Sequence, residues 1–166
     1  LLRAENLRHS FTEGSQKTEV LKGVSLQVCA GETTAVVGPS GCGKSTLLYL
    51  LGLLDRPESG KIYLNNSEVS GSSDHERTSL RNTSIGFIFQ FHFLIKELTA
   101  IENVALPLRK SGICEKEAQE RSLAILEKLG LGSKSQRFAN KLSGGEQQRV
   151  AIARAIVNSP TLILAD

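Results

Sequence analysis

The chain has 166 residues, with 20 basic and 17 acidic side chains, a formal net charge of +3 and 40% hydrophobic residues. This length predicts one domain, and the composition is that of a globular protein rather than of a disordered, collagenous or low-complexity chain. The small positive surplus gives no argument for a nucleic-acid partner. The longest apolar run, 47–54, is too short to span a membrane. Three cysteines without CxxC spacing support neither a disulfide framework nor a zinc site, which favours a reducing, cytoplasmic setting.

The first part of the chain is expected to alternate strands and turns before one helix. Two short apolar runs around Gly31 predict a strand at 24–28, a tight turn, and a second strand at 33–37. The glycine-rich stretch 38–43 is followed by leucines crowded within 47–54, which predict a buried helix.

Further strands and a polar helix are expected before the middle of the chain. A short strand is predicted at 61–64, and a helix at 73–81 whose start Ser73 or Asp74 can cap. The apolar run 84–89 predicts another strand, which closes at a glutamine.

Residues 91–141 are expected to be helical. Thr99 can cap a helix through Leu108, and a second helix is predicted at 115–129 with a glycine stop after it. One face of the second helix is expected to carry Ala118, Ser122, Ile125 and Leu129.

The end of the chain is expected to return to the sheet. A glycine turn at 143–145 precedes a helix through Val157 and a closing apolar strand at 161–166. Strand, helix and strand in this order predict a parallel sheet.

The glycine-rich stretch matches the phosphate-binding pattern GxxxxGK[ST], between a predicted strand and a predicted helix. Such a loop directs several N–H donors at one point, and the helix dipole adds partial positive charge there. Lys44 is expected to reach the β- and γ-phosphates and Ser45 to bind magnesium. The loop consists of Gly38, Pro39, Ser40, Gly41, Cys42, Gly43, Lys44, Ser45 and Thr46.

Two further places are candidates for phosphate chemistry. Asp166 ends an apolar strand, which taken alone is usual for a surface aspartate but beside a phosphate loop predicts a magnesium anchor. Ser143 with Glu146 forms a capping-box pattern, which leaves two glycines, Gly144 and Gly145, unexplained. Because glycines let an anion approach backbone amides closely, we expect two copies to meet head to tail with nucleotide between them.

These motifs together resemble the nucleotide-binding subunit of ABC transporters over essentially the whole chain. The resemblance rests on GPSGCGKST, the glutamine after GFIF, LSGGEQQRVAIARA and the terminal LILAD. It implies an α/β fold: a P-loop NTPase parallel-sheet core with a β-rich N-terminal part and a helical insert. It further implies a single nucleotide-binding domain, with 1–90 and 142–166 as core and 91–141 as the helical subdomain.

The resemblance also implies roles for individual residues, with ATP and Mg²⁺ as cofactors. Gln90 would be the Q-loop residue, which couples magnesium and the attacking water to the helical insert. Asp166 would be the Walker B aspartate, so Ser45, Gln90 and Asp166 are the expected metal ligands, and Lys44, Gln90 and Asp166 the expected catalytic residues. Ser143, Gly144 and Gly145 belong to the signature, which touches the γ-phosphate held by a second protomer. Phe11 stands where the family places an aromatic that stacks on adenine; the alternative is an edge-strand core residue.

The family's catalytic glutamate, D-loop and switch histidine would lie beyond Asp166. No methionine is present, even at position 1, and we expect the chain to be cut at both ends, to bind ATP and hardly to hydrolyse it. Glu146 is not expected to substitute as a general base, and we expect His9, His75 and His92 to face solvent.

Within the family, FIFQFHFLI and LTAIENV are similar to the lipoprotein-releasing and macrolide-exporter group, and most similar to the lipoprotein-releasing subunits. This implies a peripheral ATPase on the cytoplasmic face of the bacterial inner membrane, paired with membrane permease subunits. The apolar cluster Phe91, Phe93, Leu94 and Ile95 is the candidate docking surface; the alternative is that it packs inside the insert.

Two other function classes stay open. A soluble ABC ATPase acting on ribosomes or nucleic acid would share the nucleotide machinery, although the short insert disfavours the DNA-repair type. A GTPase or small-molecule kinase would keep only the phosphate loop. Residues 140–143 lack the aspartate of the guanine-reading NKxD pattern, which argues against a GTPase.

Overall fold

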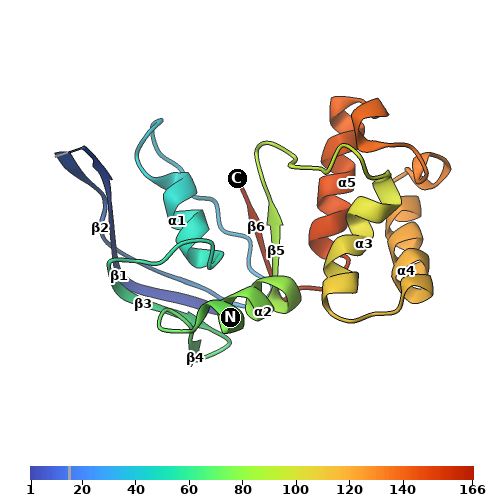
Figure 1. Cartoon of the computed structure of the whole chain (residues 1–166). Helices are drawn as coiled ribbons and strands as arrows, with labels where there is room; N and C mark the ends of the chain where they lie inside the picture. The colour runs from blue at the N-terminus through green and yellow to red at the C-terminus, as the bar shows by residue number, and fades with distance from the viewer. Residues whose placement is uncertain (15) are drawn as a thin grey trace. The chain divides into compact units, whose positions relative to one another are not determined.

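The computed structural model describes residues 1–14 and 16–166 and divides the chain into two compact units, 1–79 and 80–166. Figure 1 labels their helices and strands. Each unit holds its own sheet: a four-stranded sheet in the first and a two-stranded sheet in the second. The expected α/β class is confirmed.

The sheet of the first unit is antiparallel, in the order β2-β1-β3-β4. Its strands are β1 (Leu2–Glu13), β2 (Gln16–Val28), β3 (Ser59–Leu64) and β4 (Ser67–Glu68). The helix α1 (Lys44–Leu51) follows the phosphate loop, and the unit boundary falls within α2 (Asp74–Ser84). The strands expected at 24–28 and 61–64 and both helices are therefore confirmed, with Ser73 Oγ accepting from Glu76 N at 3.3 Å as the cap of α2.

The strand expected at 33–37 is wrong. The turn at 29–32 forms, with Glu32 N donating to Cys29 O at 3.3 Å, but the residues after it have no strand geometry. Val37 is 86% exposed. An extended segment becomes a strand only when a neighbour completes its ladder, and among the described residues no strand pairs with 33–37. The apolar pattern of 33–37 indicates β-propensity, but without a paired neighbour the segment does not become a strand.

The long strand β1 was not anticipated, because a bulge interrupts its alternation. The buried positions Leu2 and Ala4 are followed by Leu7 and His9, so one extra residue separates the two pairs. The register with β2 shifts at this place, and Asn6 has a φ of 49°. The bulge restores the inward direction of the later residues. His9 therefore lies buried on the inward face, which corrects the expectation that it faces solvent.

The second unit pairs a small parallel sheet with a helical cluster. The strands β5 (Ile85–Ile88) and β6 (Leu162–Ala165) run parallel, as expected, with Ile85 opposite Leu162. The helices are α3 (Ala100–Lys110), α4 (Glu115–Lys128) and α5 (Gly144–Ile156), with short 3₁₀ turns η1 (Gly132–Lys134) and η2 (Ala139–Lys141). The helical character expected for 91–141 is confirmed at α3 and α4, whereas 91–99 form no helix and 129–141 contain only the two short 3₁₀ turns.

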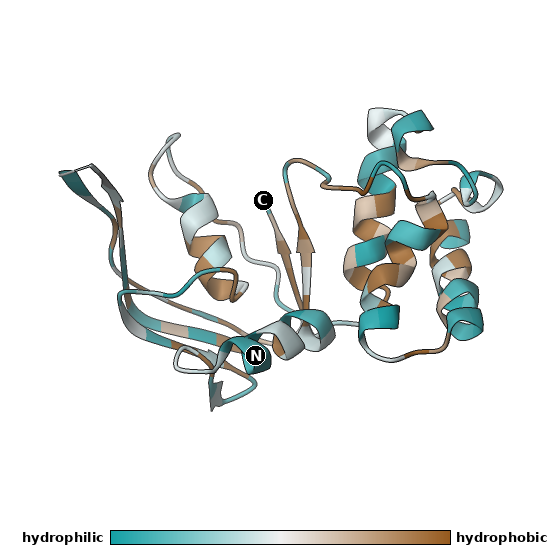
Figure 2. Ribbon diagram, in the orientation of Figure 1, coloured by the Kyte–Doolittle hydropathy of each residue, from teal (hydrophilic) through white to brown (hydrophobic). Residues whose placement is uncertain are grey.

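The three helices of this unit share one hydrophobic core. Val104, Leu108 and Leu126 have no exposed surface, and α5 adds Val150 and Ala153. Figure 2 shows hydrophobic residues alternating with hydrophilic ones along these helices, as one-sided burial requires. On α4 the buried stripe runs through Ala118, Ser122 and Leu126, whereas the expected Ile125 and Leu129 are only partly buried against the core.

None of the helices in the described residues is both long and apolar enough to cross a bilayer.

Candidate nucleotide site

The phosphate loop contains two glycines with left-handed backbone conformations just before α1. Gly41 has a φ of 77° and Gly43 a φ of 96°, and Gly43 is the N-cap of α1. The first bond of the helix runs from Leu47 N to Gly43 O at 2.9 Å. No side chain caps this helix start. Because the first N–H groups of a helix have no intrahelical acceptor, the loop presents donors where an anion can accept.

Packing within the first unit explains two of the loop's glycines. A Cβ on Gly43 would lie 2.7 Å from Val20 Cγ1, and a Cβ on Gly38 would lie 2.7 Å from Cys42 Sγ. Both separations are too short for real contacts. At Gly43 the loop can pass this close to β2 only because a side chain is missing, whereas at Gly38 an added Cβ would displace the Cys42 thiol.

Lys44 lies over the loop that precedes it. Its ammonium donates to Gly38 O at 2.9 Å and to Pro39 O at 2.8 Å. The loop residues 38–42 are exposed. A cation held by backbone oxygens at an exposed, amide-rich bend fits a polyphosphate, because none of the described carboxylates forms an ion pair with it.

Gln90 and Asp166 come together at one edge of the parallel sheet. The register places Ile88 opposite Ala165, and Asp166 N donates to Ile88 O at 3.0 Å, so both site residues follow the carboxyl ends of neighbouring strands. Both are exposed. This is the edge at which open parallel sheets bind ligands. Ser45 belongs to the first unit, and its joint use with Gln90 and Asp166 in holding magnesium stays a prediction.

The capping box at the start of α5 is formed. Ser143 N donates to Glu146 Oε2 at 2.8 Å, and Ser143 Oγ accepts from Glu146 N at 3.4 Å. The other carboxylate oxygen of Glu146 pairs with Lys134 of η1. The Lys134 ammonium, followed by the Ser143 N–H, lowers the pKa of Glu146 to about 2. Glu146 therefore serves to accept structural hydrogen bonds, and its low pKa makes it a poor general base.

The two signature glycines are not required by the chain's own packing. A Cβ on Gly144 would meet none of the described atoms within 4 Å, and one on Gly145 only Arg149 Nη1 at 4.0 Å. Neither has a positive φ. Ser143, Gly144 and Gly145 are all exposed. This differs from Gly43, where both conformation and space demand glycine.

Phe11 lies on β1 and is 50% exposed. The alternative that it is a core residue is therefore wrong. Its ring contacts the buried His9 edge-on, with 5.0 Å between centroids. The exposed face is free of that contact, and its stacking on adenine stays a prediction.

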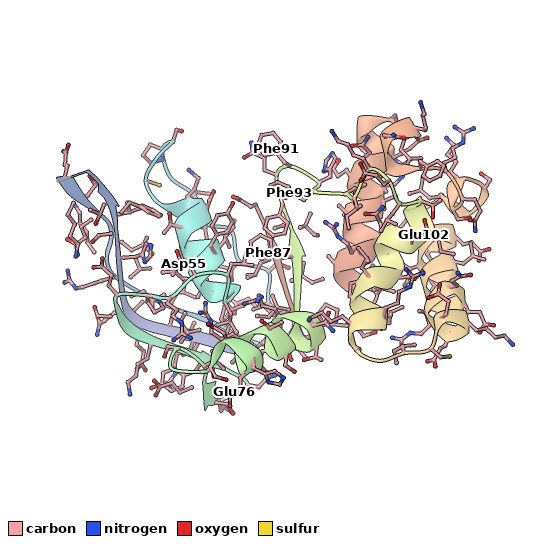
Figure 3. All side chains as sticks on the ribbon, viewed as in Figure 1. Asp55, Glu76, Phe87, Phe91, Phe93 and Glu102 are labelled. Carbon is pink, nitrogen blue, oxygen red and sulfur yellow. The ribbon has the colours of Figure 1, made fainter. Side chains whose placement is uncertain are left out.

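The apolar residues after Gln90 divide between surface and core. Phe91 is 71% exposed and Phe93 63% exposed, and Ile95 is exposed as well, whereas Leu94 packs against the helical core. Figure 3 shows Phe91 and Phe93 on the loop beyond β5, with Phe87 on the strand. The alternative that the cluster packs inside the insert holds for Leu94 alone.

The sequence reasoning missed three polar residues around these motifs. Lys134 fixes Glu146, Asn103 bonds the backbone of Ile95, and Arg154 bonds the backbone before it. Neither arginine nor lysine stands in a pattern that gives its partner. The available signal was an asparagine within an otherwise largely apolar predicted helix, as in IENVAL, where Val104, Ala105 and Leu106 follow it.

The comparisons with known proteins agree with this geometry. A family model described as "ABC transporter" matches residues 21–166. The chain belongs to the ABC transporter family. It is an ATP-binding cassette with a P-loop NTPase fold, and an ATPase by family.

Similar proteins cover the chain from end to end. It is 53% identical over 166 residues to the lipoprotein-releasing system ATP-binding protein LolD of Aquifex aeolicus (strain VF5), covering all of this chain and 72% of that protein. It is 46% identical over 165 residues to the LolD of Paramagnetospirillum magneticum (strain ATCC 700264 / AMB-1), covering 99% of this chain and 73% of that protein.

Among solved structures, the ATP-binding cassette MJ0796 has a TM-score of 0.94 and 40% identity, covering all of this chain and 73% of that one. That structure is a dimer in a post-hydrolysis state bound to ADP and Pi. A second MJ0796 structure, with the same TM-score, is described as a dimeric bacterial ABC transporter cassette.

Proposed function

We propose that this chain is the ATP-binding part of a lipoprotein-releasing transporter, and that the full-length subunit couples ATP binding and hydrolysis to release of lipoprotein by a membrane partner. The observation that carries the proposal is the 46% to 53% identity, over 99% to 100% of the chain, to proteins named for that system. None of the relatives reported above is described as acting on ribosomes or nucleic acid, so no observation favours that alternative.

ATP is bound first by the phosphate loop. Lys44 places its charge on the β- and γ-phosphates, and the amides between Gly38 and Thr46 donate to the oxygens. Ser40, Gly41 and Cys42 lie on the exposed bend of that loop. Phe11 offers its exposed face to the adenine ring, where stacking adds attraction without a directional bond.

The metal ligands would be a hydroxyl, an amide and a carboxylate, from Ser45, Gln90 and Asp166. These oxygen donors suit Mg²⁺, which binds through one or two carboxylates together with substrate phosphates and retains several waters. When bound, the ion neutralises charge on the transferred phosphoryl group. The proposal is supported by the positions of Gln90 and Asp166 in the chain, because both follow the carboxyl ends of the paired strands β5 and β6.

Two protomers are proposed to enclose the nucleotide. The exposed signature residues Ser143, Gly144 and Gly145 supply a hydroxyl and uncrowded amides, and the lack of side chains at the two glycines answers no need of this chain's own fold. A γ-phosphate held on the phosphate loop of the partner subunit explains that lack. The dimeric state of MJ0796 supports this arrangement.

The membrane partner is proposed to dock on Phe91, Phe93 and Ile95, at the cytoplasmic face of the bacterial inner membrane. These large apolar side chains are exposed directly after Gln90. Exposed apolar patches of this kind are typical of interaction sites. The patch would thus link a moving membrane partner to Gln90 at the edge of the parallel sheet.

The docking proposal is tested by copurification of the full-length subunit with its membrane subunits. Phe93→Asp should abolish copurification, because it buries a charge in the interface, and aspartate accepts the φ of 45° at this position. Phe138→Asp, at a phenylalanine that is 51% exposed elsewhere on the same unit, is the matched control. Retained binding of the Phe93 variant would contradict the proposal.

Nucleotide binding is tested separately with Lys44→Ala. Loss of a charged donor should weaken MgATP binding roughly 10- to 100-fold, as measured by calorimetric titration. Undiminished affinity would overturn the assignment of the loop.

A further inference from the structure

An arginine of α5, the helix that begins at the signature and is called the signature helix below, binds the backbone that carries the exposed Phe91 and Phe93. Arg154 of α5 donates from Nη1 to Phe93 O at 2.7 Å and from Nη2 to His92 O at 2.8 Å. The partners lie 61 and 62 residues away in the chain. Two nitrogens of one planar group thus hold two consecutive carbonyls.

Arg154 is costly to place where it lies. Burial lowers the pKa of its guanidinium, since the charged form loses hydration. A buried charge is tolerated when its donors are satisfied, and here both partners are backbone oxygens rather than carboxylates. A bond to backbone fixes the path of the chain, whatever side chains it carries. Lysine has a single ammonium and cannot reproduce the two-pronged geometry.

The same segment is held at its other end by α3. Asn103, which has no exposed surface, accepts from Ile95 N at 2.8 Å and donates to Ile95 O at 3.0 Å. At the first anchor Phe93 takes a φ of 45°, which an aromatic residue rarely adopts. The docking segment, residues 91–95, is therefore irregular in backbone and yet tied to two packed helices.

We propose that Arg154 is a positioning residue that joins the docking segment to the signature helix, so that a displacement of 91–95 by a docked partner is passed to Ser143. This rests on the proposed function, because it requires a partner at Phe91 and Phe93. Ser143 caps the same helix, about 17 Å along its axis from Arg154. A helix packed through Val150 and Ala153 moves as a unit and carries the displacement over that distance.

The test measures ATPase activity of the full-length subunit alone and with its membrane subunits. Arg154→Ala should leave basal activity in place and reduce the stimulation by the membrane subunits roughly 2- to 30-fold, the range for residues that modulate coupling. Arg154→Lys should recover part of it. Arg121→Ala is the matched control, because Arg121 also donates to a backbone oxygen at the end of this helix, Val157 O at 3.2 Å, without touching the docking segment.

A double-mutant cycle with Phe91→Ala, which trims the docking surface without adding a charge, separates coupling from general damage. If Arg154 acts through the docking segment, the losses of stimulation in Phe91→Ala and Arg154→Ala should be less than additive in the double variant; fully additive losses would overturn the proposal. Stimulation that is normal in Arg154→Ala would overturn it as well. If the unsubstituted subunit itself shows no stimulation, the proposed function fails, and the coupling fails with it.

Hydrogen exchange gives a readout that needs no partner. Arg154→Ala should speed amide exchange in the peptide covering 91–95 and leave α4 unchanged, whereas Arg121→Ala should not affect that peptide. Unchanged exchange at 91–95 in Arg154→Ala would show that the arginine does not hold the segment, and would overturn the inference whatever the transporter does.

Discussion

The starts of α1 and α5, both predicted to bind phosphate, differ in how their free backbone N–H groups are capped. At α1 the N-cap is Gly43, with no side-chain bond to the first turn, and the nearby Lys44 bonds loop carbonyls instead. At α5 the N-cap is Ser143, whose capping box with Glu146 is complete, and Lys134 pairs with that glutamate. The start of α1 is therefore open, meaning that no side chain caps it, and the start of α5 is closed by its capping box.

This difference assigns different tasks to the two glycine-rich motifs. The phosphate loop keeps its donors available, and its glycines are forced by left-handed conformations and close packing. The signature is stable without ligand, and its glycines are free of any such demand. The first motif is therefore suited to grip a nucleotide, and the second to be presented, already folded, to a nucleotide held elsewhere.

The largest effect is expected from Gly43→Ala. The substitution places a Cβ 2.7 Å from Val20 Cγ1 in a residue whose φ is 96°. The strain should cost about 2–3 kcal/mol of unfolding free energy, measured by urea denaturation. Gly41→Ala has a positive φ but meets no described atom within 4 Å, so it should show the conformational part alone. Equal losses in the two variants would remove the packing argument.

A moderate effect is expected from Ser143→Ala. It removes the acceptor for Glu146 N and should destabilise the second unit by about 1 kcal/mol, as N-cap losses do. Ser143→Thr keeps the hydroxyl and should be nearly neutral in thermal unfolding. Gly43 has no side chain to remove, so the corresponding test cannot be made at α1. A Ser143→Ala variant as stable as the parent would show that the two helix starts do not differ in side-chain capping.

A smaller effect is expected in the pH dependence of stability, to which the Glu146 carboxylate at the start of α5 contributes. Pairing with Lys134 and Ser143 lowers the pKa of Glu146 from 4.5 to about 2, so the folded state favours the carboxylate. The stabilisation is present in full above pH 4.5 and is lost as the pH falls toward 2. Other carboxylates titrate in this window too, so the measurement is the difference from Glu146→Gln, which keeps the capping pattern without the charge. Parallel curves for the two proteins would count against this assignment.

The smallest stability effect is expected from Gly144→Ala. Alanine is the better helix former and finds open space, so stability should be unchanged or rise by up to about 0.5 kcal/mol. If the amide must approach a phosphate of the partner subunit, ATP-dependent dimerisation should nevertheless weaken, measured by light scattering. Unaltered dimerisation would leave these glycines without a role.

Local patterns were sufficient for the elements that their own residues stabilise. The start of α3 followed from Thr99, which the structure shows in a capping box with Glu102. The start of α1 followed from the phosphate-loop pattern, and the start of α5 from the capping-box pattern at Ser143. By contrast the strand expected at 33–37 did not form, and β1 was missed because the bulge at Asn6 broke its alternation. Strand formation depends on a neighbour that no local pattern contains.

The sequence by itself determined the family of this protein, through the amide-rich loop with Lys44, the signature at Ser143 and the acidic strand end at Asp166, and from them it predicts the chemistry. These are short motifs whose function depends on adjacent residues. Only the tertiary structure decided which residues hold the motifs in place, such as Lys134 on Glu146 and Arg154 under Phe93. The physical reason is that such bonds join groups distant in the chain, and packing of the helices, not local sequence, brings donor and acceptor within reach.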